Sequence, residues 1–190
     1  RSTIARHVTD NSANLAGADS AAIRRDRGRL ADPLQSPQVS AAFRLEYSRR
    51  IAPLLGSVIK SGADVNAINA AVIAGELATD EGVDLLIEGM KSSSASVRYQ
   101  SVAGARRTFE TLQASAEAMS GPAGERLTAA LADRLSKDPD TLVVDGAVRG
   151  LLAAAGVTKP AFTANRTLAV SRLSKGLAGR AEFTVDQPAS

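Results

Sequence analysis

The sequence contains no cysteine, no tryptophan and only one histidine among its 190 residues. The absence of cysteine excludes disulfides, thiol nucleophiles and thiolate metal ligands. The single histidine, His7, has an acidic neighbour in Asp10 but no second imidazole with which to form a typical metal site. We therefore expect neither a metal nor a cofactor. No run approaches the roughly 18 consecutive apolar residues of a membrane span, so we predict that the chain does not cross a membrane.

Aromatic residues are also scarce. They make up 3% of the chain, while hydrophobic residues in total make up 44% and charged residues 23%. This is the composition of a globular protein, and alanine, leucine and valine must fill most of its core. Alanine and leucine are strong helix formers, and no stretch shows the polar–apolar alternation of a half-buried strand. We therefore predict an all-α protein.

Helix start and stop signals divide the chain into segments. We expect residues 1–35 to form an irregular arm with a short helix around 20–30, residues 36–180 a helical domain, and residues 181–190 a flexible tail. Ser36 and Pro37 are typical of a helix start, and Pro53 should kink or break the helix that they open. The predicted helices of the domain cover residues 37–60, 65–78, 81–90, 96–119, 121–136, 139–155 and 160–177.

Three helix–turn–helix pairs align across their turns without a gap. The aligned columns are Leu54/Leu86/Leu131, Val58/Met90/Leu135, Val65/Val97/Leu142, Ala70/Val102/Ala147 and Leu77/Phe109/Ala154. A single pair of this kind cannot bury its apolar face alone, so successive pairs are expected to stack and share a core. The tetrapeptide Arg-Leu-Ser-Lys at 134–137 recurs at 172–175 and indicates a fourth leading helix that lacks a second helix.

The segment around the second turn carries a family resemblance. Ser94-Ala95-Ser96-Val97-Arg98, followed by Val102-Ala103, resembles the Asp…Val-Arg…Ala signature of HEAT and armadillo-like helical repeats. The resemblance covers about residues 38–178, although only one unit has the Val-Arg pair and the repeat period is irregular. It implies a short right-handed array of antiparallel helix pairs, an α-solenoid. The alternative fold is a plain six- or seven-helix bundle whose amphipathic helices happen to align.

The resemblance implies a non-enzymatic scaffold that binds a protein or peptide on the face formed by the second helices of its repeats. If the family geometry applies, that face includes Asn66, Asn69, Arg98 and Ser101. Exposure of these side chains would support the assignment, and burial between helices would make it wrong. An arginine at the position of Arg98 commonly bonds to the adjacent unit in the family, and we prefer that structural role for it.

Residues that could support catalysis are few. The carboxylates of Asp80, Glu81 and Asp84, and those of Asp138 and Asp140, cluster at helix starts, where capping and the helix dipole explain them. No phosphate-binding glycine-rich loop is present. No serine lies in a strand–turn–helix elbow, and the only histidine that could activate one is His7. We therefore expect no catalytic residue and no enzymatic activity within this chain.

Two alternative functions stay open. The first is binding of a nucleic-acid backbone through arginines that could form a basic patch, namely Arg24, Arg25, Arg27, Arg29, Arg49, Arg50, Arg106 and Arg107. We do not favour it, because the net charge is only +3 and no aromatic residues interleave with these arginines. The second is an accessory domain of an enzyme complex. The compartment also stays open between the cytoplasm and, if a signal peptide was removed, the periplasm or exterior.

Overall fold

The computed structural model describes residues 2–36, 38–61 and 63–185. Within these residues the chain is all-α, as predicted, and contains no strand. The helices are α1 (Ser2–Asn11), α2 (Ser20–Gln35), α3 (Ala41–Lys60), α4 (Asp64–Leu77), α5 (Asp80–Gly89), α6 (Ala95–Ala114), α7 (Gly121–Lys137), α8 (Thr141–Ala155) and α9 (Thr163–Val185), with a 3₁₀ helix, η1 (Pro160–Phe162), before α9.

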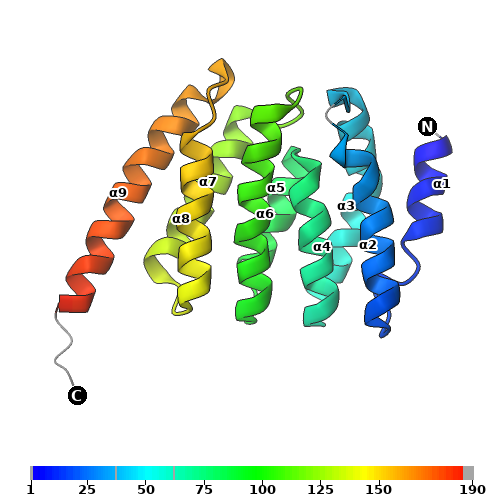
Figure 1. The fold of residues 1–190 in the computed structure, drawn as a ribbon, viewed down its shortest axis with the longest axis horizontal. Coiled ribbons are helices and arrows are strands. Elements are labelled where there is room, and N and C mark those ends of the chain that lie inside the picture. The colour runs from blue at the N-terminus through cyan, green and yellow to red at the C-terminus, as the bar shows by residue number, and fades with distance from the viewer. Residues whose placement is uncertain (1, 37, 62, 186–190) are drawn as a thin grey trace.

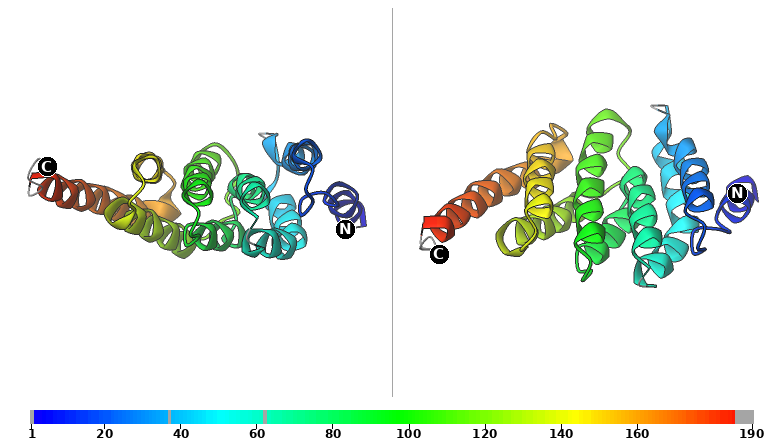
Figure 2. Two further views of the ribbon diagram at one scale, coloured as in Figure 1. Left: turned by 90° about the horizontal axis from the view of Figure 1, so that it is seen from below. Right: turned by 60° about the horizontal axis from the view of Figure 1, so that its bottom comes forward.

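The helices lie side by side in two layers (Figure 1, Figure 2). One layer contains α2, α4, α6 and α8, and the other contains α3, α5, α7 and α9. From α2 onward, consecutive helices alternate between the layers. Each of these helices therefore packs within its layer on the second helix along the chain. Helix α1 contacts α2 and α3 at one end of the molecule, and α9 contacts α7 and α8 at the other.

The N-terminal 35 residues are not the irregular arm that we predicted. Helices α1 and α2 occupy most of them, and the polar residues that suggested irregularity serve as caps and loop anchors. Asp19 caps α2 by accepting a hydrogen bond from the N–H of Ala21. The carboxylate of Asp26 accepts two hydrogen bonds from Asn14, one from its backbone N–H and one from its side chain. The polar residues Asn14 and Asp19 therefore mark the loop between α1 and α2 and the start of α2, and they do not indicate an irregular arm.

The start of α3 differs from the prediction. The helix begins at Ala41, because the hydroxyl of Ser40 accepts a hydrogen bond from the N–H of Phe43 at 3.2 Å. Ser36, the predicted cap, instead lies at the C-terminal end of α2. Pro37 lies outside the described residues. Two serines with similar capping ability flank this junction, and the pattern alone does not choose between them.

Other helix boundaries also differ from the predicted ones. Helix α3 continues without a break through Pro53, and the buried residues Ile51 and Leu55 on either side hold it against the core. Helix α6 ends at Ala114 rather than near 119, and α8 begins at Thr141. Helix α9 runs to residue 185, so the backbone of residues 181–185 is helical rather than a tail, while residues 186–190 lie outside the described part.

The aligned columns differ in burial. The column Ala70/Val102/Ala147 and the column Leu77/Phe109/Ala154 are buried throughout and lie in the core between the layers. The column Val65/Val97/Leu142 is not, because Val65 and Leu142 are 47% and 63% exposed. Its prediction as a shared core position is therefore wrong for two of its three members.

Two glycines, Gly75 of α4 and Gly104 of α6, allow these neighbouring helices to approach each other closely. A Cβ atom placed on Gly75 of α4 would lie 2.8 Å from the Cα and 2.9 Å from the carbonyl oxygen of Gly104 on α6. Backbone atoms cannot rotate away as a side chain can, so any larger residue must push α4 and α6 apart. By contrast, a Cβ placed on Gly28 of α2 meets no atom within 4 Å.

We expect Gly75→Ala to lower the free energy of unfolding by about 1–3 kcal/mol, because overpacking against backbone outweighs the better helix propensity of alanine. The control, Gly28→Ala, should raise it by about 0.5–1 kcal/mol, because alanine is favoured inside an unobstructed helix. Urea unfolding followed by circular dichroism measures both changes. Equal stabilisation by the two substitutions would contradict the close approach of α4 to α6.

Candidate functional site

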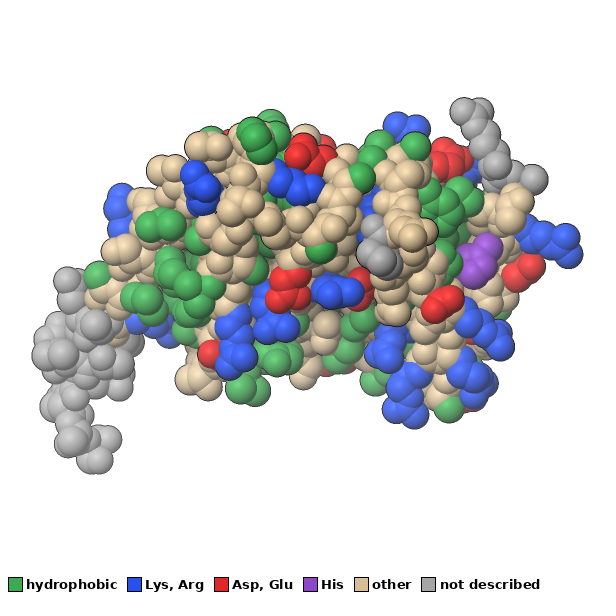
Figure 3. All heavy atoms as spheres, turned by 45° about the horizontal axis from the view of Figure 1, so that its top comes forward, with side chains coloured by type: hydrophobic (Ala, Val, Ile, Leu, Met, Phe, Trp, Pro, Cys, Tyr) green, Lys and Arg blue, Asp and Glu red, His purple; other side chains and the backbone are tan. Residues whose placement is uncertain are grey.

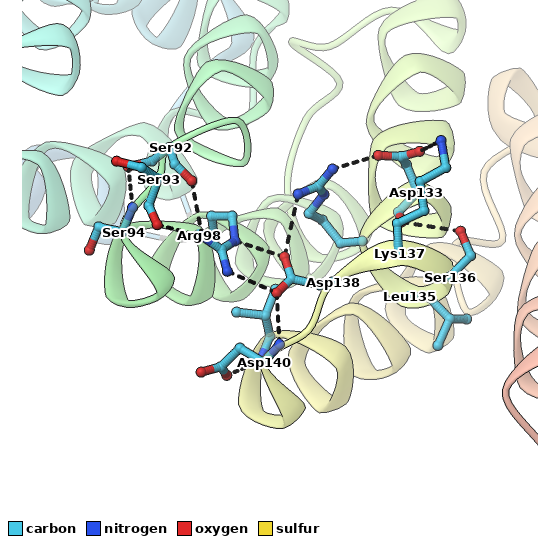
Figure 4. Close-up of polar contacts among 12 residues, drawn as sticks. Ser92, Ser93, Ser94, Arg98, Asp133, Leu135, Ser136, Lys137, Asp138 and Asp140 are labelled. Atoms are coloured by element: carbon cyan, nitrogen blue, oxygen red, sulfur yellow. Dashed lines mark hydrogen bonds and ion pairs between the residues drawn. The ribbon is translucent and has the colours of Figure 1, made fainter. Parts of the chain in front are cut away.

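Among the residues that the structure describes, the most buried ion pair joins α6 to the turn between α7 and α8 (Figure 4). Arg98, in the first turn of α6, donates to both carboxylate oxygens of Asp138, at 2.7 Å through Nε and at 3.0 Å through a terminal nitrogen. The side chain of Arg98 is 10% exposed and that of Asp138 is not exposed at all. This is the planar, two-point pairing that an arginine can make with a carboxylate.

Further contacts extend this pair into a cluster that connects four helices. Arg134 of α7 lies 3.4 Å from Asp138, whose carboxylate also accepts a hydrogen bond from the N–H of Asp140 at the start of α8. Arg180 of α9 donates to the backbone carbonyls of Leu135 and Asp138. The cluster therefore fixes α6, α7, α8 and α9 to one another, and the resemblance-based structural role of Arg98 fits these contacts.

The charges of the pair are mutually stabilised. Burial raises the pKa of Asp138, but the hydrogen bonds from Arg98 and from the N–H of Asp140, with the charges of Arg98 and Arg134, outweigh it, so the pKa lies below its ordinary value. The hydrogen bond to Asp138 in turn raises the pKa of Arg98. Arg98 and Asp138 thus stabilise each other in their charged forms, and their contacts to neighbouring helices give this pair a structural role.

The asparagines predicted to bind a partner are buried. Asn66 donates two hydrogen bonds from its side-chain amide to the carbonyls of Leu15 and Gly17, at 2.6 and 2.9 Å. Asn69 accepts a hydrogen bond from Arg27 of α2 at 3.1 Å. Each is only 5% exposed. These amides hold α2 and the preceding loop onto α4, so they serve the packing of the N-terminal helices.

The other two predicted partner-binding residues are buried as well. The Ser101 hydroxyl donates to the carbonyl of Val97, and a Cβ atom on Gly89 would collide with the Ser101 side chain. Arg98 is occupied by Asp138. By the criterion of exposure, the assignment of Asn66, Asn69, Arg98 and Ser101 to a binding face is wrong. The helical spacing placed them on one surface, but that surface faces neighbouring helices.

The eight arginines of the predicted basic patch are distributed over α2, α3 and α6, and α4 lies between α2 and α6 in their layer. Three of them form ion pairs with carboxylates, Arg50 with Glu46, Arg106 with Glu110 and Arg107 with Glu76, and Arg27 is bound to Asn69. Arg24, Arg25, Arg29 and Arg49 are exposed and form no ion pair with the residues that the structure describes. Basic side chains gather near the N-terminal end of the molecule in Figure 3.

An apolar groove opens on the layer of α4, α6 and α8. Its volume is about 210 Å³, and Ile68 of α4, Tyr99 of α6 and Leu142 of α8 line it together with Ser96 and Gln100. Tyr99 is 42% exposed and Leu142 63% exposed. Large apolar side chains that gather at a hollow on three neighbouring helices are typical of a surface that meets a partner. We name this hollow the second-helix groove.

The sequence did contain a signal for this groove. Leu142 was assigned to the core because it aligned with Val97, but it lies two residues after the capping residue Asp140, where a helix has only begun to pack. Tyr99 follows Arg98 directly, about 100° further round α6, and its side chain reaches the surface while that of Arg98 is buried.

His7 contributes to local structure. Its ring lies 3.1 Å from the carbonyl of Arg29 and 3.4 Å from the amide nitrogen of Asn11. Among the residues that the structure describes, no group of three or more His, Asp or Glu side chains could hold a metal ion. Of the described helices, none combines the length and apolar composition that crossing a bilayer demands.

Comparison of the chain with protein-family models, with curated proteins and with solved structures found no match.

We expect Arg98→Met to lower the free energy of unfolding by about 3–5 kcal/mol, because it leaves the buried Asp138 carboxylate without its main partner. As a matched control, Arg149→Met removes an exposed pair with Asp145 and should cost about 1 kcal/mol or less. Urea unfolding at neutral pH measures both. Similar, small losses in the two variants would show that the Arg98–Asp138 pair does not hold the helices together.

The contribution of Asp138 should also depend on pH. Because its pKa is lower in the folded protein than in the unfolded chain, the stabilisation is present above the ordinary aspartate pKa of about 4 and is lost as pH falls through the lowered folded-state pKa. Asp138→Asn removes this pH-dependent stabilisation. The stability difference between the native protein and Asp138→Asn, measured by urea unfolding from pH 7 downward, should therefore shrink below about pH 4. A difference that stays constant would contradict the assignment.

Proposed function

We propose that this chain is a non-enzymatic interaction module, a short right-handed array of antiparallel helix pairs similar to HEAT and armadillo-like proteins. The pairs are α3/α4, α5/α6 and α7/α8, and α9 is a leading helix without a partner. The alternation of the helices between two layers supports this architecture. Two aligned columns of buried residues, Ala70/Val102/Ala147 and Leu77/Phe109/Ala154, also support it.

The second-helix groove carries the functional part of the proposal. It lies on the helices that the family resemblance assigns to binding, but its lining is apolar and differs from the polar residues expected from the sequence. Tyrosine is enriched where partners bind because it combines apolar area with a hydroxyl and has little side-chain entropy to lose. The partner that fits is a protein segment that presents one or two apolar side chains to Tyr99 and Leu142.

The groove also has an acidic edge. Asp140 lines it and caps α8 by accepting hydrogen bonds from Leu142 and Val143. Its carboxylate therefore lies at the edge of the apolar hollow. A basic residue next to the apolar anchor of the partner would therefore complement the groove.

Site-specific cross-linking tests this function. A photo-reactive amino acid replaces Gln100, which lines the groove, or Leu152, which is exposed on α8 but does not line it. We expect one defined protein of the source cell to be cross-linked at 100 and not at 152, because only the groove contacts the partner. Tyr99→Ala and Leu142→Ser should then each weaken binding of that purified protein about tenfold. Equal cross-linking at both positions would contradict the assignment.

The arginines of α2 favour a second candidate, binding of a nucleic-acid backbone. Arg24, Arg25 and Arg29 are exposed, and none of them forms an ion pair within the described part of the chain. If they bind phosphates, affinity for a fluorescent DNA or RNA duplex should fall steeply as salt rises, and replacing all three by glutamine should reduce the salt slope by about 2–3. Fluorescence anisotropy measures both. Absence of binding at low salt, or a slope that the substitutions leave unchanged, would eliminate this candidate.

A further inference from the structure

A second cleft separates α7 from α9. Its volume is about 330 Å³, and residues of these two helices line it. Both helices belong to the layer of α3, α5, α7 and α9, so none of its lining comes from the helices of the second-helix groove. The cleft lies close to the cluster around Asp138, which holds the end of α9 against α7 through Arg180.

The two copies of the Arg-Leu-Ser-Lys tetrapeptide meet at this cleft. Ser136 and Lys137 of the first copy line it from α7, and Arg172 and Lys175 of the second copy line it from α9. The repeat that indicated equivalent helices in the sequence therefore brings basic residues to both walls of one hollow. The leucine of the first copy, Leu135, is buried and lies against Gly176 of α9.

The charges of the cleft do not cancel. The carboxylate of Asp133 already contacts Arg134 at 2.6 Å and Lys137 at 2.5 Å. Arg172 and Lys175 are exposed and form no ion pair with any described residue. Two positive charges at the cleft are therefore uncompensated by any described residue, whereas Lys137 is paired with Asp133.

Small residues keep the hollow open between these charges. Ala129 and Ala132 line the α7 wall, and Gly176 lies on the α9 wall. A Cβ atom on Gly176 would collide with Leu135, so only glycine allows α9 to lie this close to α7. The walls thus leave room for a compact group at a point where Arg172 and Lys175 can reach it.

We propose that the cleft between α7 and α9 binds a phosphate monoester. The guanidinium of Arg172 can donate two parallel hydrogen bonds to phosphate oxygens, and Lys175 supplies a point charge for the second negative charge. A doubly charged group with three acceptor oxygens matches these two uncompensated cations better than a single carboxylate does. The site is independent of the second-helix groove. The phosphate belongs to a small metabolite or to a phosphorylated residue of a protein.

Titration followed by ¹H–¹⁵N NMR of the full chain tests the proposal. The probes are glycerol 3-phosphate and a short phosphoserine peptide, with sodium chloride at matched ionic strength as the blank. We expect saturable shifts of the backbone signals of residues 132–137 and 172–176 with a phosphate probe, and no saturation with chloride. Tighter binding of the peptide would identify a phosphorylated protein as the source, and tighter binding of glycerol 3-phosphate a metabolite.

Three substitutions in the cleft and one control distinguish this site from general attraction of anions. Arg172→Gln and Lys175→Gln should each weaken binding about two- to fivefold, the loss expected for one exposed charge contact. Ala132→Glu should abolish binding, because it fills the cleft with a negative charge. Arg166→Gln is the control, because Arg166 is exposed on α9 but does not line the cleft.

The control should leave the affinity unchanged, and circular dichroism confirms that each variant is folded. If neither phosphate probe gives saturable shifts, or if Arg166→Gln weakens binding as much as Arg172→Gln, the proposal is overturned. Retention of full affinity by Ala132→Glu would overturn it as well.

Discussion

The packing of the C-terminal half depends on the buried pair between Arg98 and Asp138. The pair joins a helix of one layer to the turn that links the two layers, and Arg180 adds the last helix to the same point. Buried ions are costly unless each is paired and hydrogen-bonded, so the turns that surround this pair have little freedom to move. The two surface hollows lie on either side of this point, one lined by residues of α4, α6 and α8 and the other by residues of α7 and α9.

Polar contacts between successive turns repeat at the opposite ends of the helices. Ser120, before α7, donates to the carboxylate of Asp80, the first residue of α5, from its backbone and its hydroxyl. On the other side, the Ser94 hydroxyl donates to Asp64, the first residue of α4. The apolar core gives the stacked helices few directional contacts, so these bonds help to fix the register between neighbours. These two carboxylates at helix starts therefore have structural partners, and the two surface hollows differ in chemistry, one mainly apolar and one basic.

Much of the fold could be predicted from the sequence, but the site could not. The helical class follows from the high content of alanine and leucine and from apolar spacing, and the columns that include Val102 and Phe109 are buried as expected. The spacing that placed Asn66, Asn69, Arg98 and Ser101 on one helical surface was also correct. The direction in which that surface faces was wrong, because periodicity defines a face of a helix without defining its neighbour.

The sequence by itself determined that the chain is helical, that it lacks thiol chemistry, and that several of its helices begin at serine, threonine or aspartate caps. These properties depend on contacts within a few residues. Tertiary structure alone decided that Ser40 rather than Ser36 begins α3, that Leu142 is exposed, and that two distant Arg-Leu-Ser-Lys segments share one cleft. The last two outcomes depend on residues far apart in the sequence that meet only when the layers pack, and local sequence pattern does not contain that information.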